Sequence, residues 1–411
     1  HAQCRRCRDE GPVTAKPNSE ATERTPRGSA KGSAWLIRIA LALFVLLMML
    51  GIGECALRVA APLPYSSRLE WIDDGHVKAR LLPGQDPVNT SGQVVAINSL
   101  GFRGDDPSWA PSPGTLRLLV LGGSAAFCYD VSDDAHTWPA LLEQELRATL
   151  GMPVEVINLG LPGYDTSNSK VNYLFTGRAL NPHAVLVYHT WNDLKFLRLF
   201  DLDEDGMPRE FLSGVNAGGK NLPVLARFFF RWQIVQRARN VVLRSRATRR
   251  ENAYTSLEHE GANAHRMPSE RAFRLFEQSF ADLALLATSD DVLQVLVSQA
   301  TLAHPQSLEE PTHRLRIRNN LVGMTLPVLA ETWLESNRRI ASAAKTHDAL
   351  FLDGYGAVEP TLRNFKDHVH LLDPGAQTLA RSLREQLVSN PRFIELAEGI
   401  RAQRPSASER D

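Results

Sequence analysis

An aspartate and a histidine three positions apart, Asp367 and His370, have the spacing for acid–base chemistry. The carboxylate can fold back onto the imidazole and fix its tautomer, which leaves the other ring nitrogen to accept a proton from a nucleophile. His368 is a rival base because it is adjacent to Asp367. In an extended backbone, however, neighbouring side chains point in opposite directions. We therefore expect His370 to act as the base.

A serine that such a base would activate lies upstream, at Ser124. It follows Gly122 and Gly123 at the end of an apolar segment, where a strand must turn into the next element. A serine hydroxyl is a weak nucleophile at neutral pH and needs a base. The same position also suits a helix N-cap, and no glycine-rich phosphate-binding motif is present at this turn. We expect Ser124, Asp367 and His370 to be the catalytic residues.

An oxyanion formed by attack of a serine needs hydrogen-bond donors aimed at the developing charge. The backbone N–H of Gly163, the side-chain amide of Asn192 and the backbone N–H of Ser124 are candidate donors. Gly163 tolerates a backbone conformation that a residue with a Cβ resists. The alternative interpretation makes Gly163 a turn glycine and Asn192 a helix cap.

Alternating strands and helices must bring these residues together. Strands are expected at 116–121, 154–158, 184–188, 292–298 and 349–353, with helices near 138–150, 166–180, 328–345 and 374–388. This pattern predicts a parallel sheet covered by helices on both faces. Such sheets bind ligands beyond the carboxyl ends of their strands. The candidate residues follow these ends, so we expect one site at one edge.

The motifs occur in the order Gly-Gly-Ser124, Asn158-x-Gly160-x-x-Gly163, Asn192-Asp193 and Asp367-x-x-His370. This order resembles the SGNH (GDSL-type) hydrolase superfamily, over roughly residues 95–200 and 285–390. The segment 98–104 (N-S-L-G-F-R-G) also resembles a stretch before the first strand in membrane-anchored bacterial members. The sequence departs from the family at Gly123, where the namesake motif has aspartate, and at Thr190-Trp191, where Gly-x is usual. We expect Thr190 and Trp191 to narrow the acyl pocket.

The resemblance implies a flavodoxin-like three-layer α/β/α fold and ester hydrolysis by a Ser-His-Asp triad through an acyl-enzyme. Ser124 would be the nucleophile, Gly163 and Asn192 oxyanion donors, and Asp367 with His370 the acid–base pair. The substrate would be a small acyl ester, such as an acetyl group on a carbohydrate or envelope polymer, without a metal or cofactor. Alternatives are an O-acyltransferase that uses the same residues and a non-catalytic binding module. An α/β-hydrolase is disfavoured because Ala126 replaces the second glycine of G-x-S-x-G.

The N-terminal region predicts a membrane anchor. A polar segment, 1–34, precedes an apolar segment, 35–60, whose length suffices to span a bilayer if Arg38 snorkels. A cleaved signal peptide is the alternative. Basic residues before the anchor predict a single-pass protein of the inner membrane, with a cytoplasmic N-terminus and an exported body. The 46 basic and 46 acidic residues cancel, so no global field favours nucleic acid as a partner.

The expected domains are a disordered tail (1–34), the anchor (35–60), a juxtamembrane segment (61–115), the hydrolase-like domain (116–392) and a polar C-terminal tail (393–411). A helical insertion is expected at about 197–272. Its arginine-rich part, 227–250, is either a solvated helical subdomain or an amphipathic membrane-surface helix. Cys4 and Cys7 resemble half a zinc knuckle that lacks its second half. Five further histidines are interpreted as ordinary loop and surface residues: His136, His183, His189, His304 and His313.

Overall fold

The computed structural model describes residues 30–60, 69–72, 76–77, 79–85, 87–90, 93–194, 232, 234–235, 237–238, 265–314, 316–317 and 324–404. The chain divides into two compact units, His1–Val59 and Ala60–Asp411. Most of the predicted N-terminal tail, the cysteines Cys4 and Cys7, and nearly all of the arginine-rich insertion lie outside the described residues.

The first unit contains one long helix, α1 (Ala30–Ala60). Its segment Trp35–Ala60 is long and apolar enough to cross a membrane. None of the apolar window in this segment is buried inside the protein. Length and composition therefore fit a membrane span, and a signal sequence near the N-terminus passes the same test.

The second unit is built on a five-stranded sheet with the order β6-β5-β7-β8-β9. All neighbouring strands are parallel. In chain order the strands are arranged 2-1-3-4-5, which is the flavodoxin-like arrangement. The strands are β5 (Leu116–Gly122), β6 (Val154–Asn158), β7 (Ala184–Tyr188), β8 (Leu293–Val297) and β9 (Leu350–Leu352). The expected strands and fold class are confirmed.

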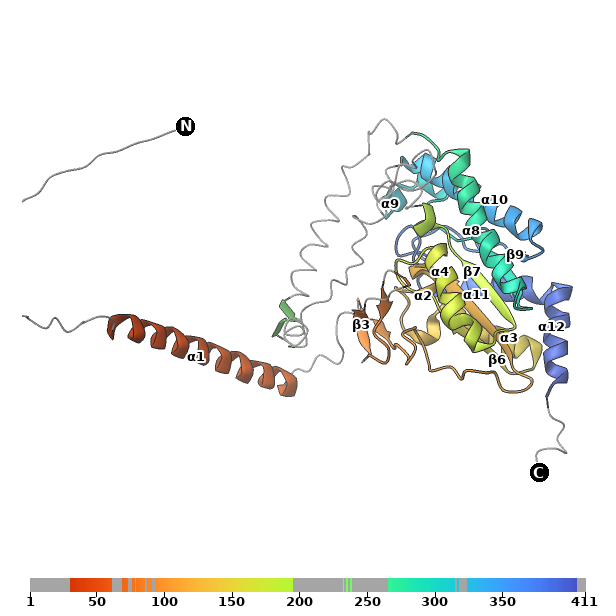
Figure 1. The fold of residues 1–411 in the computed structure, drawn as a ribbon. Helices are drawn as coiled ribbons and strands as arrows, with labels where there is room; N and C mark the ends of the chain where they lie inside the picture. The colour runs from red at the N-terminus through yellow and green to blue at the C-terminus, as the bar shows by residue number, and fades with distance from the viewer. Residues whose placement is uncertain are drawn as a thin grey trace, which may run out of the picture. The chain divides into compact units, whose positions relative to one another are not determined.

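Alternation along the central strands divides the core into two layers. Leu118 and Val120 of β5 belong to one buried cluster, whereas Leu119 and Leu121 belong to the other. Helices α3 and α11 supply the first cluster, and α8 with the C-terminal part of α10 supplies the second. Helices thus lie on both sides of the sheet (Figure 1), and the predicted three-layer α/β/α architecture is confirmed.

The main helices begin and end at recognisable signals. Helix α3 starts after the N-cap Thr137 and ends at Gly151 in the left-handed conformation. Helix α8 starts after the N-cap Ser269. Within residues 93–194 and 265–404, gaps aside, the described helices are α2 (Ser124–Phe127), α3 (Trp138–Leu150), α4 (Thr166–Asn172), α8 (Glu270–Thr288), α9 (Pro311–Arg314), α10 (Leu326–Thr346), α11 (Asp373–Val388) and α12 (Pro391–Ala402). Short 3-10 or π turns are η1 (Asp134–His136), η2 (Tyr173–Gly177), η3 (Arg178–Leu180) and η5 (Pro305–Glu309).

The described part of the expected juxtamembrane segment, 61–115, packs onto the sheet domain. It forms two short antiparallel hairpins, β1 (Trp71–Ile72) with β2 (Arg80–Leu81) and β3 (Val88–Thr90) with β4 (Gln93–Val95). Leu81, Val95 and Phe102 are buried in the second core cluster. This segment therefore belongs structurally to the second unit.

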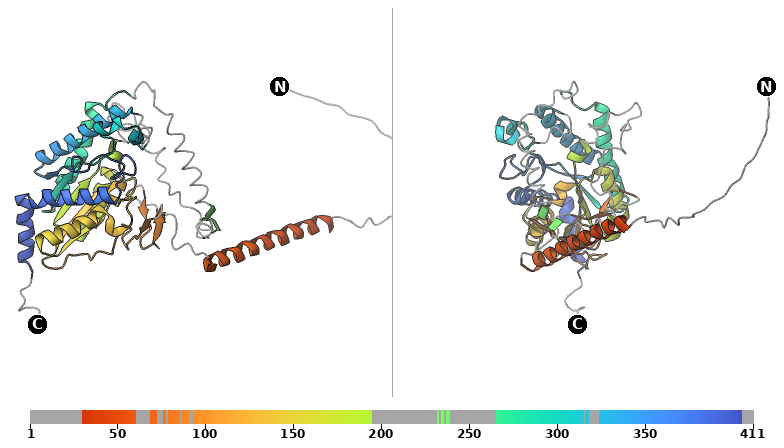
Figure 2. Two further views of the ribbon diagram at one scale, coloured as in Figure 1. Left: turned by 180° about the vertical axis from the view of Figure 1, so that it is seen from behind. Right: turned by 90° about the vertical axis from the view of Figure 1, so that its left-hand side faces the viewer.

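The predicted polar tail at 393–411 is wrong for its first part. Residues up to Ala402 form helix α12, which turns away from α11 (Figure 2). Phe393, Ala397 and Ile400 are buried in the first core cluster. They recur at positions i, i+4 and i+7, which is the apolar stripe of an amphipathic helix. Residues 405–411 lie outside the described part of the chain.

Candidate active site

The turn after the inner strand β5 presents Ser124 at the first position of α2. Gly123 is the N-cap residue, in extended conformation. A Cβ on Gly123 would lie 2.7 Å from the Asn192 Nδ2 atom and 2.9 Å from the Tyr164 carbonyl oxygen. Such distances are too short for real Cβ contacts, so glycine is needed here. The missing side chain lets Asn192 approach the turn that carries Ser124.

Ser124, His370 and Asp367 form one chain of hydrogen bonds. Ser124 Oγ lies 2.8 Å from His370 Nε2, and His370 Nδ1 lies 2.9 Å from Asp367 Oδ2. Asp367 is 6% exposed, whereas Ser124 and His370 are partly exposed. If Nδ1 carries the proton toward Asp367, Nε2 is the acceptor for the serine hydroxyl. This arrangement can transfer a proton from a hydroxyl to an imidazole.

A tight loop between β9 and α11 holds the Asp-x-x-His pair. The Asp367 Oδ1 atom accepts hydrogen bonds from the backbone N–H of Val369 (3.1 Å) and of His370 (3.0 Å). This is the local turn that an aspartate side chain favours. The backbone N–H of Lys366 donates to the His370 carbonyl at 2.8 Å and closes the loop. The spacing seen in the sequence thus leads directly to the orientation of the imidazole.

His368 points into the core. It is 2% exposed. Its ring packs edge-on against Trp191, with ring centroids 4.0 Å apart, and Trp191 stacks on Trp333. The His368 carbonyl accepts a hydrogen bond from Thr301 Oγ1 at 2.7 Å. The structure therefore places His370, and not His368, beside Ser124.

Asp367 is held in its ionised form. Burial is the largest single effect and acts to raise its pKa, whereas the nearby His368 and His370 act to lower it. Hydrogen bonds to the carboxylate add to their effect, and together they hold the pKa of Asp367 well below its usual range. An acceptor-only carboxylate fixes the His370 Nδ1–H tautomer.

Both candidate oxyanion residues lie at the same sheet edge as Ser124. Asn192 Nδ2 donates to the Tyr164 carbonyl at 2.7 Å, which fixes the orientation of the amide. An amide nitrogen carries two hydrogens, so one is left for a ligand. Gly163 precedes Tyr164 and has a φ of +82°. That left-handed conformation favours glycine.

Behind Asn192 lies a buried polar cluster. Asp193 Oδ1 accepts hydrogen bonds from the Thr166 backbone N–H (3.0 Å) and the Thr166 hydroxyl. Asp193 Oδ2 lies 3.8 Å from His189 Nδ1. Burial, followed by the charge of Asp165, raises the pKa of Asp193 to about 7. Burial lowers the pKa of His189 to about 4, so this imidazole is neutral at pH 7.

The interpretation of His189 as an ordinary loop or surface residue is wrong. His189 is 2% exposed, and its Nε2 atom lies 2.7 Å from the Ser169 hydroxyl. It directly follows β7, whose five residues are all buried, and that position was the available signal. His189 thus anchors the base of the turn that carries Asn192.

A very small cavity lies beside Ser124. Its volume is about 10 Å³, which is space for roughly one water molecule. Its lining residues are Gly123, Ser124, Ala125, His189, Thr190, Trp191, Asn192, Gln299 and Val369. Thr190 and Trp191 thus line the cavity next to Ser124.

One acidic residue near His370 carried no signal in the sequence. Asp130 Oδ2 lies 3.9 Å from His370 Nδ1. The ring of the preceding Tyr129 lies 6.5 Å from the His370 ring, measured between centroids. The chain leaves α2 through Cys128, whose φ is +59°, two residues before Asp130. Within the described residues, no group of three His, Cys, Asp or Glu side chains is arranged to hold a metal ion.

No protein-family model and no curated protein matches the chain. Solved structures do show similarity. One is a GDSL-like lipase from Bacteroides thetaiotaomicron, with 13% identity and a TM-score of 0.35 over 66% of this chain and 86% of that chain. Another is a putative acylhydrolase from Bacteroides fragilis, with 12% identity and a TM-score of 0.36 over 69% and 88%.

A third similar structure is an acetylxylan esterase from Geobacillus stearothermophilus. It has 13% identity and a TM-score of 0.38 over 66% of this chain and 93% of that chain.

Proposed function

We propose that this chain is a serine esterase of the SGNH type. The observation that carries the proposal is the hydrogen-bonded series Asp367–His370–Ser124, with distances of 2.9 and 2.8 Å. It provides a nucleophile, a base and an acid that orients the base, which are the three roles of a catalytic triad.

In the proposed reaction His370 Nε2 accepts the proton of the Ser124 hydroxyl while Oγ attacks the ester carbonyl carbon. The tetrahedral intermediate collapses, and the bond to the alcohol oxygen breaks. His370 returns its proton to that oxygen, so the alcohol leaves neutral. A water molecule then repeats the sequence on the acyl-enzyme and releases the carboxylic acid. Asp367 stays ionised and stabilises the imidazolium.

We assign the oxyanion hole to the backbone N–H groups of Ser124 and Gly163 and to the Asn192 amide. Support comes from the Asn192–Tyr164 hydrogen bond, which fixes the amide before a substrate arrives. The absence of a side chain at Gly123 leaves room for the amide beside Ser124. Preorganised donors need no reorientation during the reaction, which makes each of them effective.

We propose an acetyl-sized acyl group. The cavity of about 10 Å³ beside Ser124 has room for about one methyl group or water molecule. Thr190 and Trp191 line this cavity and restrict the size of the acyl group. Trp191 is held in place by its contacts with Trp333 and His368. On the alcohol side we propose a carbohydrate or envelope polymer, which rests on the family resemblance and on the proposed location.

We further propose that α1 is an uncleaved anchor in the inner membrane, with the N-terminus cytoplasmic and the catalytic unit exported. The length and composition of Trp35–Ala60 and the basic residues before it support this topology. The lipid bilayer would then be a partner of the chain.

Turnover of graded esters tests the proposed activity. A fragment starting at residue 62, close to the start of the compact unit Ala60–Asp411, is assayed with p-nitrophenyl acetate, butyrate and octanoate. We expect kcat/KM to fall as the acyl chain lengthens and Ser124→Ala to abolish turnover. Lack of turnover with every ester would refute the esterase, and faster turnover of octanoate would refute only the acyl size.

A further inference from the structure

The helix that presents Ser124 is only four residues long. So short a helix does not form on its own, because nucleation costs more than so few hydrogen bonds return. Its C-terminal carbonyl groups also have no partner inside the helix. Something outside the helix must therefore hold the nucleophile turn in place.

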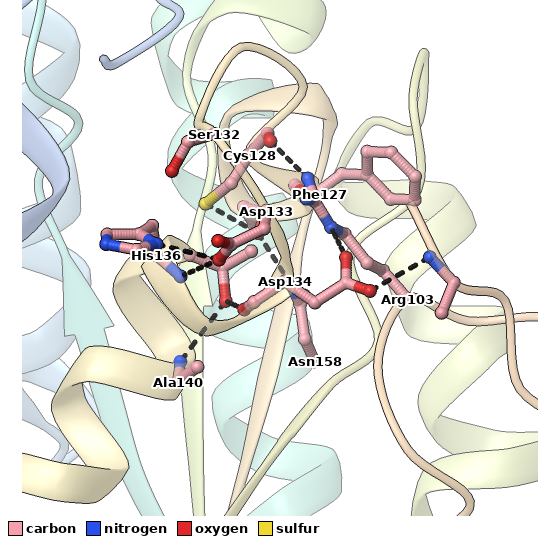
Figure 3. A network of polar contacts seen from close by, with 12 residues as sticks. Arg103, Phe127, Cys128, Ser132, Asp133, Asp134, His136, Ala140 and Asn158 are labelled. Carbon is pink, nitrogen blue, oxygen red and sulfur yellow. Dashed lines mark hydrogen bonds and ion pairs between the residues drawn. The ribbon is translucent and has the colours of Figure 1, made fainter. Parts of the chain in front are cut away.

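Side chains from three other segments bond these carbonyl groups. Trp138 Nε1 donates to the Ala125 carbonyl at 3.2 Å, and Asn158 Nδ2 donates to the Ala126 carbonyl at 2.7 Å. The carbonyl groups of Phe127 and Cys128 both accept hydrogen bonds from one arginine, Arg103 (Figure 3).

Arg103 is an almost fully buried cation at the C-terminal end of this helix. Its side chain is 1% exposed. Nη1 donates to the Phe127 carbonyl at 3.1 Å and to the Cys128 carbonyl, and Nε donates to Asp134 Oδ1 at 2.5 Å. A positive charge at a helix C-terminus interacts favourably with the helix dipole. Figure 3 shows the guanidinium between these carbonyl groups and the Asp134 carboxylate.

The segment 98–104 presents Arg103 rigidly. Asn98 Oδ1 accepts hydrogen bonds from the backbone N–H groups of Leu100 and Phe102, each at 3.0 Å. The Phe102 side chain is fully buried. Asp134 is fixed in turn, because its Oδ2 accepts the Ala96 backbone N–H at 2.9 Å. The guanidinium is thus held from both sides.

We propose that Arg103 is a positioning residue for Ser124. It sets the C-terminal end of α2 and thereby the place of the serine hydroxyl at the other end, 2.8 Å from His370 Nε2. It does not touch the substrate. This inference rests on the proposed esterase function. It also gives a role to the segment 98–104, which the sequence motifs leave without one.

Arg117 provides a matched control. It is also fully buried, with Nε donating to Glu155 Oε2 at 2.7 Å and Nη1 donating to the carbonyl groups of Ser108 (2.9 Å) and Leu180 (2.5 Å). It lies at the start of β5, whereas Ser124 follows the end of that strand. Substitution of Arg117 thus removes a comparable buried arginine at a position far from the nucleophile turn.

The test compares Arg103→Met, Arg103→Lys and Arg117→Met with the wild type, as full chains in detergent. Melting temperature, kcat and KM for p-nitrophenyl acetate, and the rate constant of Ser124 modification by a fluorophosphonate are measured. For Arg103→Met we expect kcat and the modification rate to fall about 10- to 100-fold, because small misplacements have effects of this size, with KM nearly unchanged. Arg103→Lys recovers part of both rates. Arg117→Met lowers the melting temperature and leaves both rates within about threefold of wild type.

Equal modification rates for wild type and Arg103→Met would overturn the proposal. Equal losses in Arg117→Met and Arg103→Met would overturn it too, since they would show a general effect of stability. If Arg103→Met does not fold, Arg103→Lys and Asp134→Asn carry the same comparison. A wild-type chain that neither turns over esters nor reacts with the fluorophosphonate would instead refute the esterase itself, together with the role of Arg103.

Discussion

His370 has two carboxylates near one ring nitrogen. Asp367 Oδ2 lies 2.9 Å and Asp130 Oδ2 lies 3.9 Å from Nδ1. Replacing a triad aspartate by asparagine typically lowers kcat about 10⁴-fold, because it allows the wrong tautomer. Asp130 is placed to take over part of this role.

We therefore predict that Asp367→Asn lowers kcat by only about 10²-fold, and that Asp130→Asn added to it removes most of the remainder. Asp130→Asn alone has a small effect, since Asp367 keeps the closer contact. Steady-state kinetics on the two single variants and the double variant check this. A 10⁴-fold loss in Asp367→Asn, with nothing further lost in the double variant, would show that Asp130 has no such role.

Gly123 is the residue at which the sequence departs from the GDSL motif. A Cβ there would lie 2.7 Å from Asn192 Nδ2. We predict that Gly123→Ala displaces the amide and lowers kcat by at least about 10²-fold, the typical loss of one oxyanion donor. Gly399→Ala is the control, because its Cβ meets nothing within 4 Å in helix α12. Wild-type kcat in Gly123→Ala would contradict this account of the departure.

At the residue scale the sequence predicted what depends on local geometry. The Asp367–His370 turn is closed by hydrogen bonds within four residues of chain. Arg103 and Asp130 could not be found in this way. Their partners lie on the nucleophile helix and on the loop before α11, far away in the chain, and only the tertiary structure brings them together.

The element that carries Asn192 is tied to α4 by a buried carboxyl group. Asp193 bonds Thr166 at the first position of α4, and burial raises its pKa to about 7. The ordinary value is 3.8. Between about pH 4 and 7 the unfolded chain has released this proton while the folded chain keeps it. Stability must therefore fall as the pH rises through this window.

We predict that Asp193→Asn removes this loss, because an asparagine oxygen can still accept the Thr166 hydrogen bonds. The difference in free energy of unfolding, variant minus wild type, should rise by about 1 kcal/mol per pH unit from pH 4 to 7. Above pH 7 this difference should stay constant. Urea unfolding at several pH values measures the difference. Parallel curves for the two proteins would contradict the raised pKa.

Other elements differ in how far the sequence revealed them. The strands β5 and β7 could be predicted from the sequence because the sheet buries both of their faces. Strands in such positions consist of nearly continuous apolar runs. Helix α12 was missed, although Phe393, Ala397 and Ile400 have helical spacing. The polar residues between them dominate the composition, and only the packing on the first core cluster shows which face is buried.

At the scale of the whole molecule, the proposed anchor makes a separate prediction. The hydrophobic effect on its apolar surface holds a helix such as Trp35–Ala60 in a bilayer. Added salt does not weaken this interaction. We expect the full chain to stay with membranes in high salt and in carbonate, and to be released by detergent. Release by salt alone, or an N-terminus found by sequencing to lie after residue 60, would rule out an uncleaved anchor.

The central claim is that Ser124 is a nucleophile activated by His370. The most direct measurement is mass-spectrometric mapping of the full chain after reaction with a fluorophosphonate. We predict a single adduct on the peptide that contains Ser124, strongly slowed in His370→Ala and at the wild-type rate in a variant of an exposed histidine, His136→Ala. No adduct on the wild-type chain, or an adduct on another residue that persists in Ser124→Ala, would contradict the claim.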